Sequence, residues 1–583
     1  MDVSVNVFFP ETPAFAELAP HRGVYVGDAD GRCEIFSWDT ESGASRQLTD
    51  RAQGTVTCAI EPDGQQVWWF DNEFNGIGSW RVQPFDGSAA AQPAGLPAGR
   101  PAGLAMALDG TVVAGISDER GLAVYRRRPG RPIELLRKQE DYGQLVDVSS
   151  SAGLVVLAGE PDAPNAVVVI YAETGSVTEL AGSPHRLWAA GFAPAGADRL
   201  LLAVQTLTGY RLAIWTPEDG LSVLEWCEFD TEIAVSWYPD GQRVLVRQDR
   251  HARSVLQVAD LTARRLTALE TPPGSILAAA VQPDGDLHYV WTDSTRPPRL
   301  LTGSGLRLPG AHGVEDRHPG RREDVWVPTE HGRVHALVAV PESPGPHPGV
   351  FLLHGGPFEA AMDAYDPMVS VFLSIGCAVI RPNYRGSTGY GQAWRQDFGD
   401  GVGLTQLADI AAVLRYLTDD GILRAGQVAV CGQSWGGYLA LLAAGVQPEL
   451  WRAVAAVNPI ADYAAAFGRS TAAVRALDTA LFGGTPDELP QAYARSSPSS
   501  YLEQVRAPVL LVAGTDDPKC PPEQVQSYAN RLRELGVEME LSWTKSGHEG
   551  YEVDVLVETL GAVVKFVATA LGGRPEPATS GAR

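Results

Sequence analysis

The amino-acid sequence predicts two domains of different class: an N-terminal, all-β seven-bladed β-propeller, followed by an α/β domain with a mostly parallel sheet covered by helices. A turn-like group ending in glycine recurs seven times in the first half, and β-rich runs follow each copy. Beyond about residue 320, strand-like and helix-like segments alternate instead. A chain of 583 residues is also too long for one hydrophobic core.

The recurring group gives the first half a period of 41 to 46 residues. β-rich runs such as residues 66–70 and 243–246 follow the turns, and second runs come next. Four short strands in each unit of about 40–50 residues are typical of a propeller blade, whereas an array of β-sandwiches would have less regular turns. The seven turn glycines are Gly23, Gly64, Gly110, Gly153, Gly196, Gly241 and Gly285.

The change of pattern near residue 310 sets the predicted domain boundaries. A stretch rich in glycine, proline and histidine separates the repeats from the alternating segments, as a linker does. The last residues, GGRPEPATSGAR, are typical of a flexible tail. We therefore expect an N-terminal extension (1–19), the propeller (20–310), a linker (311–322), the α/β domain (323–573) and the tail (574–583).

Composition excludes several classes of partner. Lys and Arg number 46 against 70 Asp and Glu, so the formal net charge is −24, which argues against binding to nucleic acid. The N-terminal MDVSVNVFFPE lacks the features of a signal peptide, and no stretch approaches the ~18 apolar residues of a membrane span. Six scattered cysteines without a C-x-x-C pattern disfavour a zinc site and a disulfide framework. We expect a cytoplasmic protein without metal, cofactor or membrane partner.

The most informative motif is Gly-Gln-Ser-Trp-Gly-Gly at residues 432–437. It lies between an apolar run typical of a buried strand (428–431) and one typical of a helix (438–444). A strand, a G-x-S-x-G turn and a helix form a nucleophile elbow, in which side chains at the glycines would crowd the sharp turn. The sequence therefore predicts an α/β-hydrolase domain with Ser434 as its nucleophile.

A serine hydroxyl needs a base, and the base needs a group that orients it. In α/β-hydrolases the acid and then the histidine follow the serine along the chain. Asp516 and Asp517 follow a buried strand that ends near Gly514, and Asp517, three residues after this glycine, has the expected spacing. His548 is the only histidine after His354 and lies in a glycine-flanked loop. We therefore prefer Asp517 and His548 as the acid and the base.

The tetrahedral intermediate of acyl transfer needs two backbone N–H donors, an oxyanion hole. The N–H of Trp435, directly after the nucleophile, is one candidate. The second donor should come from the loop after an early strand, and His-Gly-Gly-Pro at 354–357 follows such a strand. His354 itself is better explained as a structural residue than as a catalytic one.

These motifs together resemble those of the prolyl oligopeptidase family of serine peptidases, in particular its acylaminoacyl-peptidase branch. The resemblance covers nearly the whole chain, with a propeller before a hydrolase domain. It implies Ser434 as nucleophile, Asp517 as orienting acid, His548 as base, and Gly356 as the donor that complements Trp435. The motifs are HGGP (354–357), RGSTGYG (385–391), GQSWGGY (432–438), GTDDPKCP (514–521) and GHEGY (547–551).

The chain departs from the family pattern two residues after the acid. Family members usually have an arginine there that holds a substrate carbonyl, but this chain has Lys519, which offers a point charge without the planar fork of a guanidinium. The resemblance also places the specificity pocket in the segment 458–500. Its apolar candidates are Tyr463, Phe467, Leu481 and Phe482. Glu359, just after the HGGP motif, is an open candidate to hold a substrate amine.

The resemblance implies a serine peptidase that hydrolyses short peptides or acyl-peptides through an acyl-enzyme, with the propeller excluding folded proteins. An amide or ester hydrolase, or an acyl-transfer enzyme of specialised metabolism, remains an alternative that Lys519 favours. A non-catalytic interaction platform is a further alternative, against which the intact Ser434, Asp517 and His548 argue. The partner is then a short peptide or a small amide, and a homo-oligomer remains open because relatives often assemble to restrict access.

Overall fold

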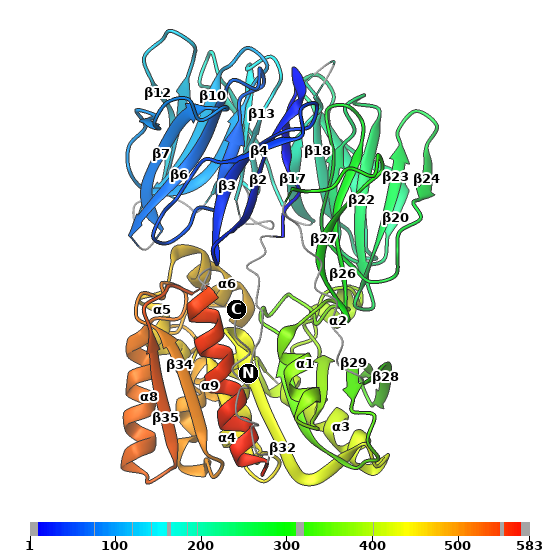
Figure 1. The fold of residues 1–583 in the computed structure, drawn as a ribbon, viewed down its shortest axis with the longest axis vertical. Helices are drawn as coiled ribbons and strands as arrows, with labels where there is room; N and C mark the ends of the chain where they lie inside the picture. The colour runs from blue at the N-terminus through cyan, green and yellow to red at the C-terminus, as the bar shows by residue number, and fades with distance from the viewer. Residues whose placement is uncertain are drawn as a thin grey trace. The chain divides into compact units, whose positions relative to one another are not determined.

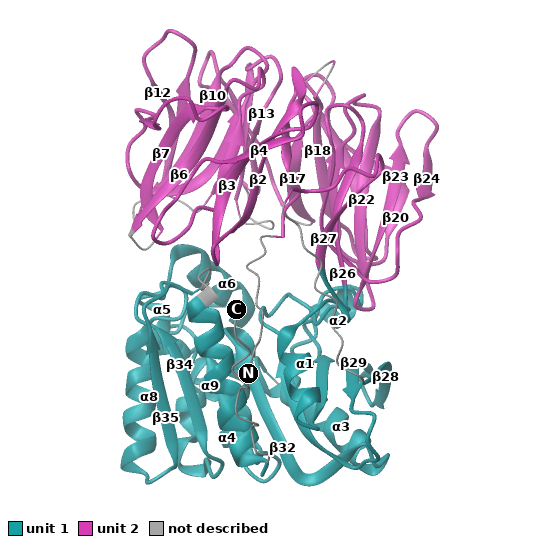
Figure 2. Ribbon diagram, viewed as in Figure 1, with its two compact units in different colours: residues 1–6, 293–297, 314–583 teal, residues 7–292, 298–313 magenta. Residues whose placement is uncertain are grey.

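A computed structural model describes residues 10–309, 320–548 and 553–572, apart from residues 75, 119–120, 141–142, 160–164, 183–184, 195, 197 and 400. The chain divides into two compact units (Figure 2), one of Val7–Thr292 with Pro298–Gly313 and one of Val314–Arg583 with Asp293–Pro297 and Met1–Asn6. Most of the predicted linker, the predicted tail and the start of the predicted N-terminal extension lie outside the described residues.

The first unit is built from seven small sheets (Figure 1), six of four strands and one of three in the described residues. In each sheet the strands follow one another in chain order. The prediction of a seven-bladed β-propeller is therefore confirmed. The blades are β1 (Ala14–Ala16), β2 (Ala19–Ala29), β3 (Arg32–Asp39), β4 (Ala44–Gln47); β5 (Cys58–Ile60), β6 (Gln66–Phe74), β7 (Ile77–Pro84), β8 (Gln92–Pro93); β9 (Arg100–Met106), β10 (Val112–Asp118), β11 (Gly121–Arg127), β12 (Glu134–Gln139); β13 (Gln144–Val148), β14 (Leu154–Ala158), β15 (Val167–Tyr171), β16 (Val177–Leu180); β17 (Arg186–Phe192), β18 (Leu200–Gln205), β19 (Tyr210–Thr216), β20 (Gly220–Phe229); β21 (Ile233–Trp237), β22 (Arg243–Arg250), β23 (Arg253–Asp260), β24 (Arg265–Ala268); and β25 (Ser275–Val281), β26 (Leu287–Asp293), β27 (Arg296–Thr302).

Alternating side chains along the inner strands join each blade to both of its neighbours. In β6, Val67 and Trp69 pack against the first blade, whereas Trp68 and Phe70 pack against the third. Successive side chains of a strand point to opposite faces, so a run that is apolar at every position buries both faces of a blade. This explains why the β-rich runs lack polar alternation.

The seventh blade packs against the first. The side-chain amide of Gln282 donates to the carbonyl of Pro13 at 3.1 Å, and the ring of Phe15 meets that of His288 edge-on. Leu306 and Leu308, which follow β27, pack on the cluster formed by Phe15 and its neighbours in the first blade. These contacts close the ring of blades. Among the described residues, no strand from one end of the propeller joins the sheet at its other end.

The second unit contains one sheet of eight strands in the order β28-β29-β31-β30-β32-β33-β34-β35. The strands from β31 onward in this order run parallel, and β29 pairs antiparallel with both β28 and β31. The strands are β28 (Arg321–Thr329), β29 (Gly332–Val340), β30 (His347–Leu353), β31 (Ala378–Asn383), β32 (Leu423–Gln433), β33 (Ala453–Val457), β34 (Val509–Gly514) and β35 (Met539–Thr544). The helices are α1 (Pro367–Ser374), α2 (Gln392–Arg395), α3 (Leu404–Asp419), α4 (Trp435–Val446), α5 (Tyr463–Phe467), α6 (Ala472–Phe482), α7 (Pro490–Ser496), α8 (Pro522–Glu534) and α9 (Val553–Ala570), with a 3-10 helix at Pro498–Gln504.

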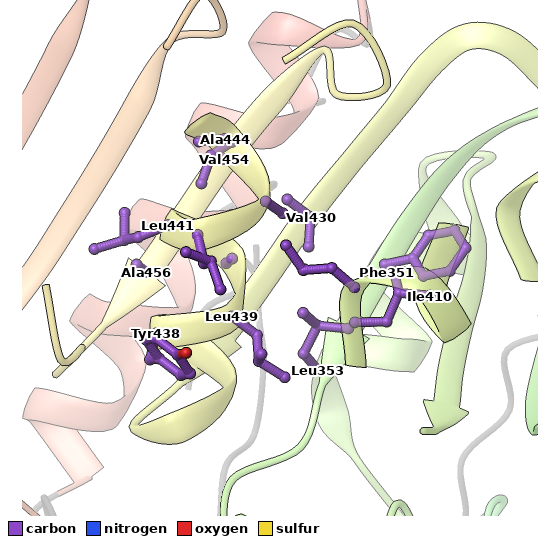
Figure 3. Close-up of a cluster of buried hydrophobic side chains, with 14 of the residues drawn as sticks. Phe351, Leu353, Ile410, Val430, Tyr438, Leu439, Leu441, Ala444, Val454 and Ala456 are labelled. Atoms are coloured by element: carbon purple, nitrogen blue, oxygen red, sulfur yellow. The ribbon is translucent and has the colours of Figure 1, made fainter. Parts of the chain in front are cut away.

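Helices cover both faces of this sheet, as predicted. Val430 of β32 points into a large cluster (Figure 3) with helices α3, α4 and α8, whereas Ala429 and Cys431 point into a second cluster with α1 and α9. Burial on both faces requires the continuous apolar runs that the sequence shows in these strands. The unit is the predicted α/β-hydrolase domain. No helix among the described residues is long and apolar enough to span a membrane.

A buried ion pair fixes the loop after β31. The guanidinium of Arg385 donates to both carboxylate oxygens of Asp409 on α3, and the backbone N–H of Arg385 donates to the same carboxylate. The exposed fractions of the two side chains are 4% and 2%. Asp397 adds a second, half-buried carboxylate. This network therefore anchors the loop to α3.

Replacement of Asp409 by Asn should lower the free energy of unfolding by about 3 kcal/mol, because it leaves the Arg385 guanidinium buried with incomplete charge compensation. Urea denaturation followed by tryptophan fluorescence measures this change. Glu534→Gln, in the exposed pair with Arg531, is the control and should change stability by less than about 0.5 kcal/mol. Equal effects of the two substitutions would contradict the role of the buried pair.

Candidate active site

Five parallel strands bring the candidate residues to one edge of the sheet. The HGGP loop follows β30, Ser434 follows β32, and Asn458 follows β33. Asp517 and His548 follow β34 and β35. Because parallel strands have their carboxyl ends at the same edge, residues that are more than 100 positions apart in the sequence lie within contact distance there.

The turn at Ser434 is sharp and strained. The serine has φ 55° and ψ −121°, a conformation that residues with a side chain rarely adopt. A Cβ at Gly432 would lie 2.3 Å from the carbonyl carbon of Gly436, and a Cβ at Gly436 would lie 2.2 Å from the carbonyl oxygen of Leu353. The two glycines therefore let strand, turn and helix approach more closely than any side chain permits, which is the geometry expected of a nucleophile elbow.

A chain of short hydrogen bonds leads from the serine to a buried carboxylate. The Oγ atom of Ser434 lies 2.9 Å from Nε2 of His548, and Nδ1 of His548 lies 2.7 Å from Oδ2 of Asp517. Asp517 is 4% exposed and His548 is 7% exposed. The structure thus brings together the three residues that the sequence singled out, in the order that a serine nucleophile requires.

The second oxygen of Asp517 is held by the backbone. Its Oδ1 accepts the N–H groups of Lys519 and Cys520, each at 2.8 Å. Asp516, the alternative acid, is half-buried and its carboxylate accepts only from the hydroxyl of Thr515 among the hydrogen bonds found in the described residues. Asp517 therefore has the fixed position that orientation of an imidazole needs, and Asp516 does not.

Asn458 is a supporting residue that the sequence reasoning missed. It has φ 45°, and its side-chain amide donates to the carbonyl of His548 at 2.9 Å while its Oδ1 accepts the N–H of Gly514. The side chain thus ties the histidine loop to the end of the acid-bearing strand. An Asn directly after an apolar strand run was the available signal, since Asn tolerates the left-handed backbone region.

The HGGP loop lies beside the nucleophile. Gly356 has φ 131°, and both Gly356 and Trp435 line the cavity into which Ser434 opens. The ring of His354 is held by three contacts: Nδ1 donates to the carbonyl of Gly355, Nε2 lies 2.9 Å from the hydroxyl of Ser387, and the ring stacks on Tyr384. Burial lowers the pKa of His354 to about 4, so the ring is neutral near pH 7 and braces the loop.

The cavity in front of Ser434 has a volume of about 470 Å³. One wall is the HGGP loop, and another is the face of α6 that presents Val474, Leu477 and Asp478 at helical spacing. The lining residues are Gly355, Gly356, Pro357, Glu359, Gln433, Ser434, Trp435, Ile460, Thr471, Ala473, Val474, Leu477, Asp478, Lys519, Cys520 and His548.

The apolar residues proposed for the specificity pocket lie behind this wall. The hydroxyl of Tyr463, a completely buried residue, accepts a hydrogen bond of 2.7 Å from the indole N–H of Trp435. Phe467, Leu481 and Phe482 pack against the same core, and none of the four is in the cavity lining. The predicted segment 458–500 does supply the wall, but through the first turns of α6 rather than through its last turn. Lys519 lines the cavity, as expected, with an exposed side chain.

Cys520 and Asp478 are lining residues that no motif indicated. Burial, together with Asp517 and Asp478, raises the pKa of the Cys520 thiol. Among the described residues, Asp517, Cys520 and His548 form the one group of three metal-ligating side chains, with ligand atoms within 4.8 Å of one another. Asp517 and His548 are hydrogen-bonded to each other, so a metal ion would bind only by disrupting that pair.

Comparisons with known proteins agree with this fold. A sequence profile described as "Prolyl oligopeptidase family" matches residues 364–574. The acylamino-acid-releasing enzyme of Homo sapiens is 28% identical over 364 residues, which are 58% of this chain and 50% of that enzyme. The chain thus spans about half the length of the curated relatives it matches.

Solved structures share the two-domain fold along almost the entire chain. A structure described as puromycin hydrolase has a TM-score of 0.82 at 20% identity and covers 97% of this chain and 96% of its own. Acylaminoacyl peptidase of Pyrococcus horikoshii has a TM-score of 0.76 at 16% identity and covers 98% of this chain and 97% of its own. Fold and family together define the class as serine hydrolases of the α/β-hydrolase type. More particularly, residues 364–574 match the prolyl oligopeptidase family, and the chain is similar to acylamino-acid-releasing enzymes.

Replacement of Gly436 by Ala should slow the reaction of Ser434 with a fluorophosphonate probe by about 100-fold, because the added Cβ overlaps the carbonyls of Leu353 and His354 and displaces the turn. Probe labelling over time, followed by mass spectrometry, measures the rate. The control is Gly561→Ala in α9, where a Cβ meets nothing within 4 Å. Labelling at the unsubstituted rate in Gly436→Ala would show that the close approach is not required.

Proposed function

We propose that this protein is a serine peptidase that hydrolyses short peptides or acyl-peptides through an acyl-enzyme. The observation that carries the proposal is the hydrogen-bonded chain Asp517–His548–Ser434, which opens into a cavity of about 470 Å³. The family match and the names of the acylamino-acid-releasing relatives support a peptide substrate. The cavity is large enough for one or two amino-acid residues rather than for a long segment.

In the proposed reaction His548 takes the proton of Ser434 as the hydroxyl attacks the scissile carbonyl. Asp517, whose other oxygen is fixed by two backbone N–H groups, keeps Nδ1 of His548 protonated, so that Nε2 is free to act as base. The N–H groups of Trp435 and Gly356 stabilise the oxyanion. His548 then gives the proton to the leaving amine, and a water molecule activated by the same imidazole hydrolyses the ester at Ser434.

Lys519 is proposed to act on a substrate carbonyl from the edge of the cavity. The side chain is exposed, and its ammonium offers a point charge where a guanidinium would offer two parallel donors. The carbonyl is then held less rigidly, and a wider range of acyl groups is accepted. This favours amide substrates other than ordinary peptides as a second candidate.

That second candidate is an amide or ester hydrolase, or an acyl-transfer enzyme, of specialised metabolism. The observation that favours it, besides Lys519, is the fold shared with proteins named for the hydrolysis of puromycin. Both candidates use the same nucleophile, so they differ only in the groups that the cavity holds on either side of the scissile bond.

The proposal includes a size limit imposed by the propeller and a cytoplasmic location. A propeller beside a hydrolase domain along the whole chain is also the fold of the solved peptidases it resembles. All six cysteines are unpaired in the structure, which fits a reducing compartment. Digestion of a ten-residue peptide but not of an unfolded protein such as casein would support the size limit.

Replacement of Ser434 by Ala should leave the fold intact and lower kcat by at least about 1,000-fold, because the covalent route is lost. Hydrolysis of a chromogenic p-nitroanilide measures kcat, and the thermal midpoint reports folding. Ser500→Ala, at an exposed serine whose hydroxyl bonds only to the carbonyl of Ala494, is the matched control. If Ser434→Ala kept more than a few per cent of the activity, the nucleophile would lie elsewhere. If a fluorophosphonate probe did not label the unsubstituted protein, a non-catalytic platform would be favoured.

A substrate panel separates the two candidates. Acetyl-alanyl, free alanyl and prolyl p-nitroanilides are offered side by side with puromycin, each at several concentrations. We expect kcat/KM to be largest for one of the alanyl compounds, since the cavity is bounded and lacks the shape of a long groove. Cleavage of puromycin with no turnover of the three peptide analogues would overturn the peptidase proposal in favour of the amide hydrolase.

A further inference from the structure

Asp478 places a carboxylate in the wall of the cavity. It lies on α6 one helical turn after Val474 and directly after Leu477, and all three line the cavity. Asp478 is only 5% exposed. The fully enclosed polar atoms that lack a hydrogen-bond partner do not include the carboxylate oxygens of Asp478. The carboxylate therefore faces the open space of the cavity rather than the core.

Nothing within the described part of the chain compensates this charge. No hydrogen bond and no ion pair of the described residues involves the Asp478 carboxylate. Its electrostatic neighbours, the groups on whose pKa it acts, are neutral hydroxyls and a thiol. Burial raises the pKa of Asp478 to about 7, the direction expected for an acid without a cation beside it. These neighbours are Tyr438, Tyr463, Tyr493 and Cys520, whose own pKa values are raised by burial and by Asp478.

The carboxylate is also close to the reacting atoms. Asp478 acts electrostatically on Cys520, and both residues line the cavity into which Ser434 opens. Asp478, Ser434 and the two candidate oxyanion donors line one and the same cavity. A substrate whose carbonyl reaches Ser434 therefore has neighbouring groups within reach of this carboxylate.

A buried, uncompensated carboxylate costs stability unless a partner removes the cost. Resting on the proposed function, we propose that Asp478 is a specificity-determining residue that binds a positively charged nitrogen of the substrate. Two sources have this chemistry: the side chain of a basic residue, or the free α-amine of a peptide. In both cases the substrate cation supplies the counter-ion that Asp478 lacks. The ion pair forms away from bulk water, and there the attraction between opposite charges is strong.

Glu359 is the other acid of the cavity and the natural comparison. It lines the same cavity, after the HGGP motif, but it is exposed and already has interactions of its own within the protein. A carboxylate that is already engaged gains less from a cationic ligand than one without a partner. The two acids therefore make different predictions, which substitution can separate.

The test uses two matched pairs of substrates with the full-length protein. Acetyl-lysyl and acetyl-norleucyl p-nitroanilides differ only in the side-chain ammonium, and free alanyl and acetyl-alanyl p-nitroanilides differ in the α-amine. We expect the unsubstituted protein to have a kcat/KM at least about tenfold higher for the cationic member of one pair. Which pair shows the preference identifies the source of the cation.

Asp478→Asn should abolish that preference, lowering kcat/KM for the cationic substrate at least about tenfold and for its neutral partner less than about threefold. Glu359→Gln should retain the preference. A neutral substrate preferred by the unsubstituted protein, an equal loss for both members of a pair in Asp478→Asn, or a preference removed by Glu359→Gln instead would each overturn the inference.

A measurement without any variant guards against a misfolded Asp478→Asn protein. Butylammonium should inhibit hydrolysis of a neutral ester at least about tenfold more strongly than 1-butanol, its uncharged counterpart. Equal inhibition would overturn the inference.

If a fluorophosphonate labels Ser434 and the substrates turn over without any preference for charge, the inference fails and the proposed function stands. If neither labelling nor turnover occurs, the proposed function fails, and the inference fails with it.

Discussion

The close approach of three backbone segments at Ser434 is the constraint on which the rest of the site depends. The carbonyl of Leu353 and the backbone of Gly432 and Gly436 meet at distances that leave no room for a Cβ. This contact holds the serine in a conformation that it would not adopt alone, and α4 and the neighbouring strands, packed on both faces, supply the stability that offsets the strain. The hydroxyl is thereby fixed at the edge of the sheet rather than on a mobile loop.

The other groups then need only short loops. Because β30, β33, β34 and β35 run parallel with β32, each loop after a strand begins at the same edge, and local hydrogen bonds suffice to aim its side chains. Asn458 joins two of these loops, and backbone N–H groups fix one oxygen of Asp517. The precision of the site thus comes from the sheet, and the loops contribute the chemistry.

This division explains what could be predicted from the sequence. The blades, the parallel sheet and the residues Ser434, Asp517 and His548 follow from local patterns, namely turn glycines, apolar runs and motifs with fixed spacing. The cavity wall does not, because apolar residues continue along the whole of α6 and its sequence AAVRALDTALF does not reveal which turns meet the core. The expected residues Leu481 and Phe482, in the last turn, pack against the core, whereas Val474, Leu477 and Asp478 in the earlier turns line the cavity.

Asp478 is the feature of the cavity wall that the sequence does not reveal. A single acid in an apolar helix is usually solvated, so sequence alone gives no reason to place it in a cavity, whereas the structure has Asp478 buried in the lining of the cavity at Ser434. Natural sequences keep an uncompensated buried acid where function requires it, since nearly any apolar residue would be more stable there. Lys519, whose side chain is exposed, lines the same cavity and acts electrostatically on Cys520. The cavity therefore combines a buried acid with an exposed ammonium, which together would orient a substrate that carries a cationic nitrogen and a carbonyl oxygen.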